Sequence, residues 1–77
     1  MTLAQYRVSY WTGPTQVAQV ADRLRKHDAT GVEEGTERVY FRVSATDGPA
    51  ARYLADQTLQ AIGMPRTGIR DSLAYLG

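Results

Sequence analysis

The sequence predicts a single α+β domain, residues 1–77, in which two helices cover one face of a four-stranded, antiparallel-rich sheet. A length of 77 residues suits one domain and is too short for two. Side chains that alternate between polar and apolar at 6–12 and 38–45 indicate strands, and apolar stripes at helical spacing in 14–28 and 48–62 indicate helices. The resulting order, strand-helix-strand-strand-helix-strand, is the ferredoxin-like βαββαβ pattern.

The first strand and first helix are separated by a clear break. In the strand at 6–12, apolar side chains point one way and Arg7, Ser9 and Trp11 point the other. Thr12-Gly13-Pro14 ends this strand, and Pro14 is expected at the first position of a helix, where its fixed φ suits the helical backbone. The helix then runs to about Asp28 with an apolar stripe formed by Val17, Val20, Ala21 and Leu24.

The middle of the chain predicts a weak strand, a turn and a strong strand. Residues 30–32 can begin a short strand, and Glu33-Glu34-Gly35-Thr36 is typical of a turn. The strong strand at 38–45 places valine, phenylalanine and alanine on one side and polar residues on the other. We expect the two strong strands, first and third, to lie in the centre of the sheet and parallel to one another. The two weak strands are then its edges.

The second helix has start and stop signals, whereas the tail is ambiguous. Asp47 is the expected cap, Pro49 suits the first turn, and Gly63 is expected just beyond the end. The tail at 67–77 fits both strand alternation and helical spacing, and the architecture favours a fourth strand. The helix is expected to bury a face formed by Ala51, Leu54, Ala55, Thr58 and Ile62, with Leu59 at its flank. The expected core comprises Tyr6, Val8, Tyr10, Val17, Val20, Leu24, Val39, Phe41, Val43, Leu54, Thr58 and Ile62.

One segment resembles a known group of proteins. The run Tyr40-Phe41-Arg42-Val43-Ser44-Ala45-Thr46-Asp47-Gly48-Pro49-Ala50-Ala51-Arg52 reads as a strand leading into a capped, alanine-rich helix. It is similar to many short ferredoxin-like proteins of actinobacteria and their phages. The resemblance implies the same fold over nearly the whole chain and an accessory protein of a phage or its host. It implies no function, because one fold serves many unrelated functions.

Composition excludes several classes of protein. Nine basic residues nearly balance eight acidic ones, which leaves a net charge of +1, whereas a dedicated duplex-DNA binder carries a clear basic excess. The chain has no cysteine, so neither a disulfide nor a thiolate metal site is expected, and a reducing cytoplasm suits it. No stretch approaches the roughly 20 apolar residues of a membrane span. We expect a cytoplasmic protein that does not bind membranes.

No arrangement of residues predicts catalysis or metal binding. His27, the single histidine, is expected at the end of the first helix, where the helix dipole favours a positive charge. The acidic residues form no metal-binding motif, and no serine has the sequence context of a nucleophile. We therefore expect no enzyme activity, no metal and no cofactor.

The polar side of the two strong strands is the candidate binding surface. Arginines interleaved with aromatic residues suit a protein partner, because tryptophan, tyrosine and arginine dominate interface hot spots. This favours a homodimer or a host or regulatory protein, held by Trp11 and Tyr40 side by side with Arg42 stacked alongside. A single-stranded nucleic acid is the alternative, a small-molecule sensor of the ACT type is a second, and an ordinary mixed surface is the third. The candidate residues are Arg7, Ser9, Trp11, Arg38, Tyr40 and Arg42.

Overall fold

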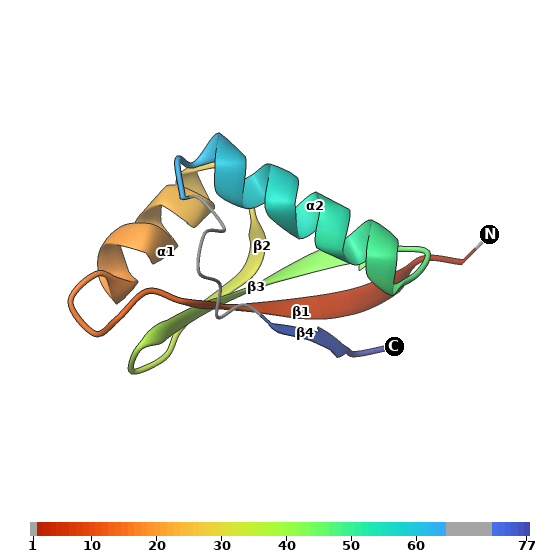
Figure 1. The fold of residues 1–77 in the computed structure, drawn as a ribbon, viewed down its shortest axis with the longest axis horizontal. Coiled ribbons are helices and arrows are strands. Elements are labelled where there is room, and N and C mark those ends of the chain that lie inside the picture. The colour runs from red at the N-terminus through yellow and green to blue at the C-terminus, as the bar shows by residue number, and fades with distance from the viewer. Residues whose placement is uncertain (1, 65–71) are drawn as a thin grey trace.

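A computed structural model of the chain describes residues 2–64 and 72–77. Its six elements follow the predicted order, and both helices lie on one side of a four-stranded sheet (Figure 1). The ferredoxin-like α+β prediction is therefore confirmed. The elements are β1 (Ala4–Trp11), α1 (Val17–Lys26), β2 (Thr30–Glu34), β3 (Arg38–Ala45), α2 (Gly48–Ala61) and β4 (Ser72–Tyr75).

The sheet has the order β2-β3-β1-β4, so the two strong strands are central as predicted. They run antiparallel, however, with Val8 opposite Phe41 and Arg7 opposite Arg42, and the expected parallel pairing is wrong. The reason is topological. The short hairpin makes β3 antiparallel to β2, and the crossover through α1 brings β2 back in the direction of β1. Because β3 lies between β1 and β2, it runs opposite to both.

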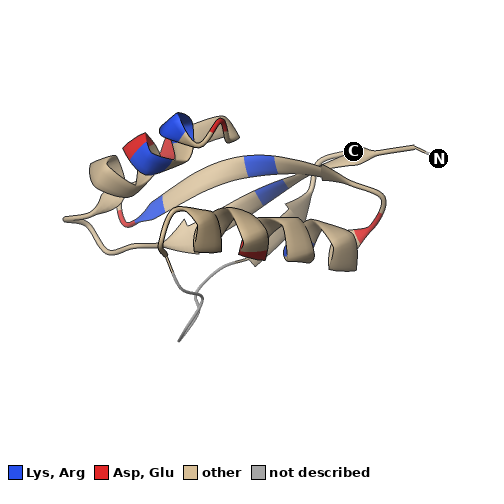
Figure 2. Ribbon diagram, turned by 90° about the horizontal axis from the view of Figure 1, so that it is seen from above, with Lys and Arg blue, Asp and Glu red and all other residues tan. Residues whose placement is uncertain are grey.

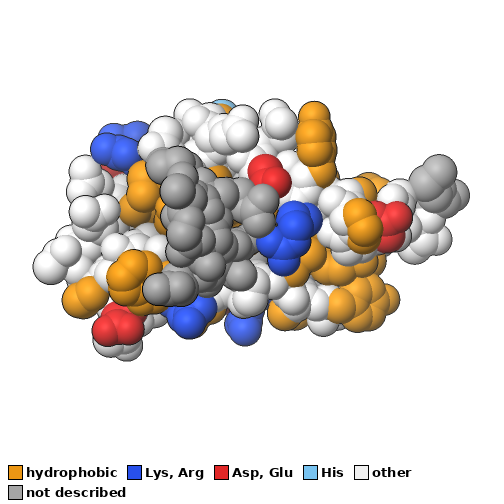
Figure 3. Space-filling view, in the orientation of Figure 1, with side chains coloured by type: hydrophobic (Ala, Val, Ile, Leu, Met, Phe, Trp, Pro, Cys, Tyr) orange, Lys and Arg blue, Asp and Glu red, His pale blue; other side chains and the backbone are white. Residues whose placement is uncertain are grey.

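The ambiguous tail forms a strand where it is described. β4 pairs antiparallel with β1, and Tyr75 lies opposite Tyr6. The part of the predicted segment at 67–71 lies outside the described residues. In the space-filling view, hydrophobic side chains gather on this side of the molecule around β4 and the C-terminal residues (Figure 3).

The strand β2 is longer than its sequence suggests. Glu33 and Glu34 belong to the strand rather than to the turn, opposite Tyr40 and Val39 of β3. The turn begins at Gly35, whose N–H donates to the Arg38 carbonyl at 2.8 Å. Pairing with β3 satisfies the backbone of the two glutamates, and this outweighs their weak preference for strands.

The helix α1 begins three residues later than predicted, at Val17, with Gln16 as its cap. The N–H groups of Thr12 and Gly13 both donate to the Glu37 carbonyl, at 3.0 and 3.1 Å, which holds this loop against the β2–β3 hairpin. Residues 14–16 therefore form a turn and not the first helical turn. The predicted stripe is buried, comprising Val17, Val20, Ala21 and Leu24.

The core lies between the helices and the sheet, as predicted, but the buried face of α2 differs. Leu54 is 39% exposed, whereas Leu59, which we expected at the flank, is completely buried. Residues four apart lie on one stripe of a helix, and the buried stripe contains Ala51, Ala55 and Leu59. The two alanines allow the helix to approach the sheet closely, and Leu59 then fills the space beside Phe41 in the same cluster. Thr58, Ile62 and Val43 are only partly buried.

The cap of α2 is confirmed and gives a first prediction. The Asp47 side chain accepts a hydrogen bond from the Ala50 N–H at 2.9 Å. Asp47→Ala should lower the free energy of unfolding by about 1 kcal/mol, because that N–H loses its partner at the start of the helix. Asp47→Asn keeps a capping oxygen and should stay within a few tenths of a kcal/mol of the wild type. Urea denaturation followed by circular dichroism measures both, and equal losses would contradict the capping role.

Candidate functional site

The side of the sheet opposite the helices, here called the open face, carries all six candidate residues. Residues directly opposite in an antiparallel pair share a side, and Val8 and Phe41 are buried beneath the helices. Their neighbours along each strand therefore point to the other side. No other described segment covers this side (Figure 1). The opposing pairs are Arg7 with Arg42, Ser9 with Tyr40, and Trp11 with Arg38.

Arg7 stacks on Tyr40 in the middle of the open face. The Arg7 guanidinium carbon lies 4.9 Å from the centroid of the Tyr40 ring, within the range of a cation–π contact. In the chain alone it is thus Arg7 that stacks on this ring, whereas we expected Arg42 to stack beside the aromatic pair when a partner binds. Arg7 and Tyr40 are diagonal neighbours on β1 and β3, which places a long side chain within reach of the ring.

Arg42 lies instead along Gly31 of the edge strand β2. A Cβ atom built on Gly31 would be 2.7 Å from Cγ and 2.8 Å from Cδ of Arg42, so only glycine leaves room for this side chain. Gly31 also has a φ of +63°, a conformation that glycine adopts without strain. Glycine inside a strand often marks the close approach of another group. That signal was present in the sequence, but it does not say which group approaches.

Gly35 contacts the Tyr40 ring, and Ser9 accepts a hydrogen bond from Arg38. A Cβ atom on Gly35 would lie 3.0 Å from Cε2 of Tyr40, so the ring rests against the hairpin. Arg38 Nη1 donates to Ser9 Oγ at 3.3 Å, and Ser9 is only 8% exposed because longer side chains cover it. Ser9 therefore supports the face and does not offer a contact surface. A hollow of about 240 Å³ beside this group is lined by Thr36, Glu37, Arg38 and Tyr40.

Trp11 lies at the end of the open face and not at its centre. It is the last residue of β1, opposite Arg38, and 44% exposed. Tyr40 lies diagonally from it, one pair further along the sheet. We expected both aromatic residues in the middle of a patch, because the sequence did not show the register that sets Trp11 opposite Arg38, the first residue of β3.

The charges of the open face do not balance. Among the described strand residues this side carries Arg7, Arg38 and Arg42 but one acid, Glu33, which lies opposite Tyr40. Two ion pairs lie away from this side, between Arg25 and Glu34 at 3.3 Å and between Lys26 and Asp22 at 3.1 Å. Figure 2 shows lysine and arginine positions both on α1 and on the strands between the helices. Arg7 and Arg42 thus occupy directly opposing positions of β1 and β3, and neither forms an ion pair with a described residue.

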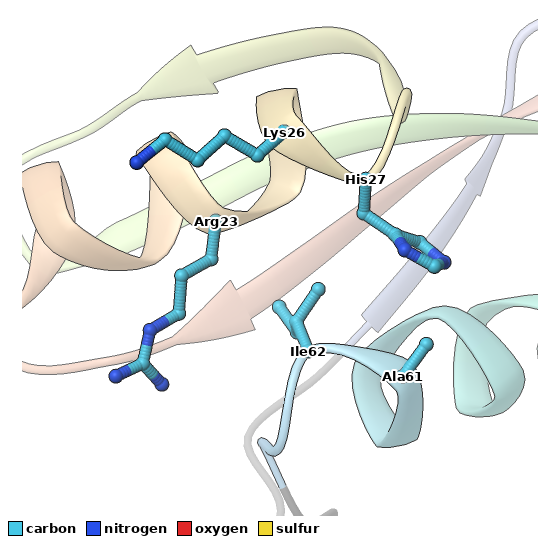
Figure 4. A pocket seen from close by; sticks show the side chains of 5 residues that line it. All are labelled: Arg23, Lys26, His27, Ala61 and Ile62. Carbon is cyan, nitrogen blue, oxygen red and sulfur yellow. The ribbon is translucent and has the colours of Figure 1, made fainter.

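A second hollow of about 240 Å³ lies between the ends of the two helices (Figure 4). The Arg23 and Lys26 side chains extend away from Ala61 and Ile62, and the His27 ring points towards them. Lys26 is already paired with Asp22. The basic residues here also lie near the C-terminal end of α1, whose carbonyl groups favour positive charge. The ion pair and the end of the helix thus account for the basic residues at this hollow, and we do not assign a ligand to it.

Within residues 2–64 and 72–77, no group of three or more histidine, cysteine, aspartate or glutamate side chains is arranged to hold a metal ion. None of the helices in that part of the chain is both long enough and apolar enough to cross a membrane. No known protein family matches the chain, and no curated protein or solved structure matches it significantly.

Proposed function

We propose that this chain is a non-enzymatic cytoplasmic binding protein whose open face docks an acidic segment of another protein. The observation that carries the proposal is the pairing of Arg7 with Arg42. Like charges directly opposite each other on adjacent strands destabilise a sheet. Neither arginine forms an ion pair with a described residue. An acidic segment that brings carboxylates to both guanidinium groups would offset these like charges.

Arginine is suited to this role by its shape. Its planar guanidinium group donates two parallel hydrogen bonds to a carboxylate, which lysine cannot do. Gly31 leaves space for the Arg42 stem, and the Tyr40 ring supports Arg7, so both groups are held before a partner arrives. Side chains that are ordered in advance lose less conformational entropy on binding.

Trp11 supplies the apolar part of the contact. It is 44% exposed at the end of the same face, beside Arg38. Tryptophan next to arginine is a frequent combination in binding hot spots. A partner segment with carboxylates over the Arg7–Arg42 pair and an apolar side chain over Trp11 would match the chemistry of this surface.

The face fits a protein better than a single-stranded nucleic acid. Nucleic-acid binders of this kind stack bases on exposed aromatic rings, but Arg7 already stacks on Tyr40, and Gly35 lies against its edge. Trp11 is the remaining aromatic residue of the described open face. The net charge of +1 provides little long-range attraction for a polyanion.

Two other expectations receive less support from the geometry. A homodimer through the open face would bring two copies of the same arginine pair together, because a two-fold interface joins a patch to itself. A small-molecule sensor needs an enclosed pocket of about 300–1,000 Å³, whereas the hollow on this face measures about 240 Å³. The resemblance to actinobacterial and phage proteins stays a prediction, and under it the partner would be a host or regulatory protein.

Fluorescence anisotropy tests the proposal with defined probes. The first probe is a labelled peptide of alternating glutamate and leucine, and the second is the same peptide with glutamine in place of glutamate. The wild-type protein should bind the acidic peptide at least about tenfold more tightly at low salt, because charge-assisted hydrogen bonds add roughly 1.5–3 kcal/mol. Raising the ionic strength should remove most of the difference.

A labelled oligothymidylate with a matching number of charges is the comparison probe. Tighter binding of this oligonucleotide than of the acidic peptide would contradict the proposal and favour a nucleic-acid partner. Equal binding of the glutamate and glutamine peptides would show that the arginine pair does not recognise carboxylates.

A further inference from the structure

The two edges of the sheet are protected unequally. β2 and β4 are the edge strands, and β2 carries the two acidic residues Glu33 and Glu34. β4, with the sequence Ser-Leu-Ala-Tyr, carries no charged residue. Charged side chains on an edge strand prevent it from pairing with another chain. The β4 edge lacks this protection. β4 pairs with β1 on one side, and no described strand pairs with its other side.

The hydrogen-bonding register shows which backbone groups of β4 point outward. The Leu76 N–H donates to the Gln5 carbonyl at 2.8 Å, which marks these two residues as a hydrogen-bonded pair. Such pairs alternate along an antiparallel ladder. Ala74 and Ser72 therefore also direct their backbone groups towards β1, whereas Leu73 and Tyr75 direct theirs away from it.

Exposed apolar side chains accompany this edge. Tyr75 is 69% exposed although its ring makes an edge-on contact with Tyr6, with centroids 5.5 Å apart. Leu76 is 45% exposed. Figure 3 shows hydrophobic side chains gathered around β4 on this side of the molecule. A surface of this kind becomes more stable when another apolar surface covers it.

We infer that β4 pairs antiparallel with β4 of a second copy of this chain. The two-fold axis passes beside Ala74, so Leu73 of one copy lies opposite Tyr75 of the other. The outward N–H and C=O groups of these two residues are placed symmetrically about Ala74. After the two-fold rotation, the groups of Leu73 in one copy therefore meet those of Tyr75 in the other and can form both backbone hydrogen bonds. No charge in β4 opposes this pairing.

The dimer would extend the sheet without using the open face. Leu73 lies opposite buried Val8, and Tyr75 lies opposite Tyr6, so both belong to the helix side of the sheet. Pairing across the axis therefore brings Leu73 and Tyr75 of the two copies together on that side. A domain of 77 residues buries a smaller share of its surface than a larger domain does, and added burial on association stabilises it.

Sedimentation equilibrium over a range of concentrations tests this inference. The wild type should pass from monomer to dimer as the concentration rises. Tyr75→Lys should raise the dissociation constant by roughly tenfold or more, because it replaces an apolar side chain opposite Leu73 of the other copy by a charge, at both symmetric positions of the edge. Tyr75→Phe keeps the ring and should dimerise like the wild type. A wild type that stays monomeric, or a dimer that Tyr75→Lys leaves intact, would overturn the inference.

Amide hydrogen exchange on the wild type gives a second readout that needs no variant to fold. The N–H groups of Leu73 and Tyr75 should exchange more slowly as the protein concentration rises, whereas those of β2 should not change. Exchange at Leu73 and Tyr75 that is independent of concentration, in a sample that does dimerise, would show that the copies meet through another surface.

Discussion

Leu59→Ala should lower the free energy of unfolding by about 2–5 kcal/mol, which is a large share of the total for a small domain. Leu59 is completely buried and packs in the same cluster as Phe41 and Leu24. Its removal leaves a cavity that the neighbouring side chains fill only in part. We expect a lower midpoint in urea and an unchanged dependence on urea concentration.

Leu54→Ala is the matched control for this prediction. It makes the same chemical change in the same helix, at a residue that is 39% exposed. Its cost should be below about 1 kcal/mol, because a side chain that is already partly in water loses less buried surface than the fully buried Leu59. Chemical denaturation of the two variants side by side measures the difference. If Leu54→Ala proves the more costly of the two, α2 buries the face that its sequence suggested.

Arg42→Gln should weaken binding of the acidic peptide by roughly 10- to 100-fold, because one charge-assisted contact is lost. The matched control is Arg23→Gln, which removes the same charge from α1 on the helix side. It should change the affinity little, since salt screens charges on separate faces. Anisotropy titrations of both variants measure the effect. Equal losses would show that net charge, and not the arginine pair, attracts the peptide.

The same variant should have the opposite effect on the fold. Arg7 and Arg42 are like charges at opposing positions of adjacent strands, so Arg42→Gln should be as stable as the wild type or more stable by up to about 1 kcal/mol. A residue that weakens the fold and strengthens binding is typical of a functional site. A clear loss of stability in Arg42→Gln would instead indicate that Arg42 supports the structure.

The sequence predicted the order of elements because its periodicity is strong where the elements are long. Tyr6, Val8 and Tyr10 alternate clearly, and all three are buried. The predictions failed where tertiary contacts decide the outcome. Bonds from Thr12 and Gly13 to the Glu37 carbonyl delay the start of α1. The orientation of α2 depends on how closely its alanines approach the sheet, and helical spacing alone fits several faces.

The candidate site was predicted as a set of residues but not as an arrangement. Alternation alone places Arg7, Trp11 and Arg42 on one side of the sheet. It does not show that Arg7 lies opposite Arg42, because that depends on the register and direction of two strands far apart in the chain. The roles of Gly31 and Gly35 depend on the register between β2 and β3, which shifts between Thr30 and Glu33. The like-charge pair, which carries the proposed function, could be found only from the structure.

The most direct test of the proposed function is an NMR titration of isotope-labelled protein with the glutamate–leucine peptide. Trp11 is the single tryptophan, so its indole N–H gives one unambiguous signal from the end of the open face. We predict that this signal and the side-chain N–H signals of Arg7 and Arg42 shift together, and that those of Arg23 and Arg25 on α1 stay in place. Shifts confined to α1, or none on the open face at peptide saturation, would contradict the proposal that this face binds an acidic partner.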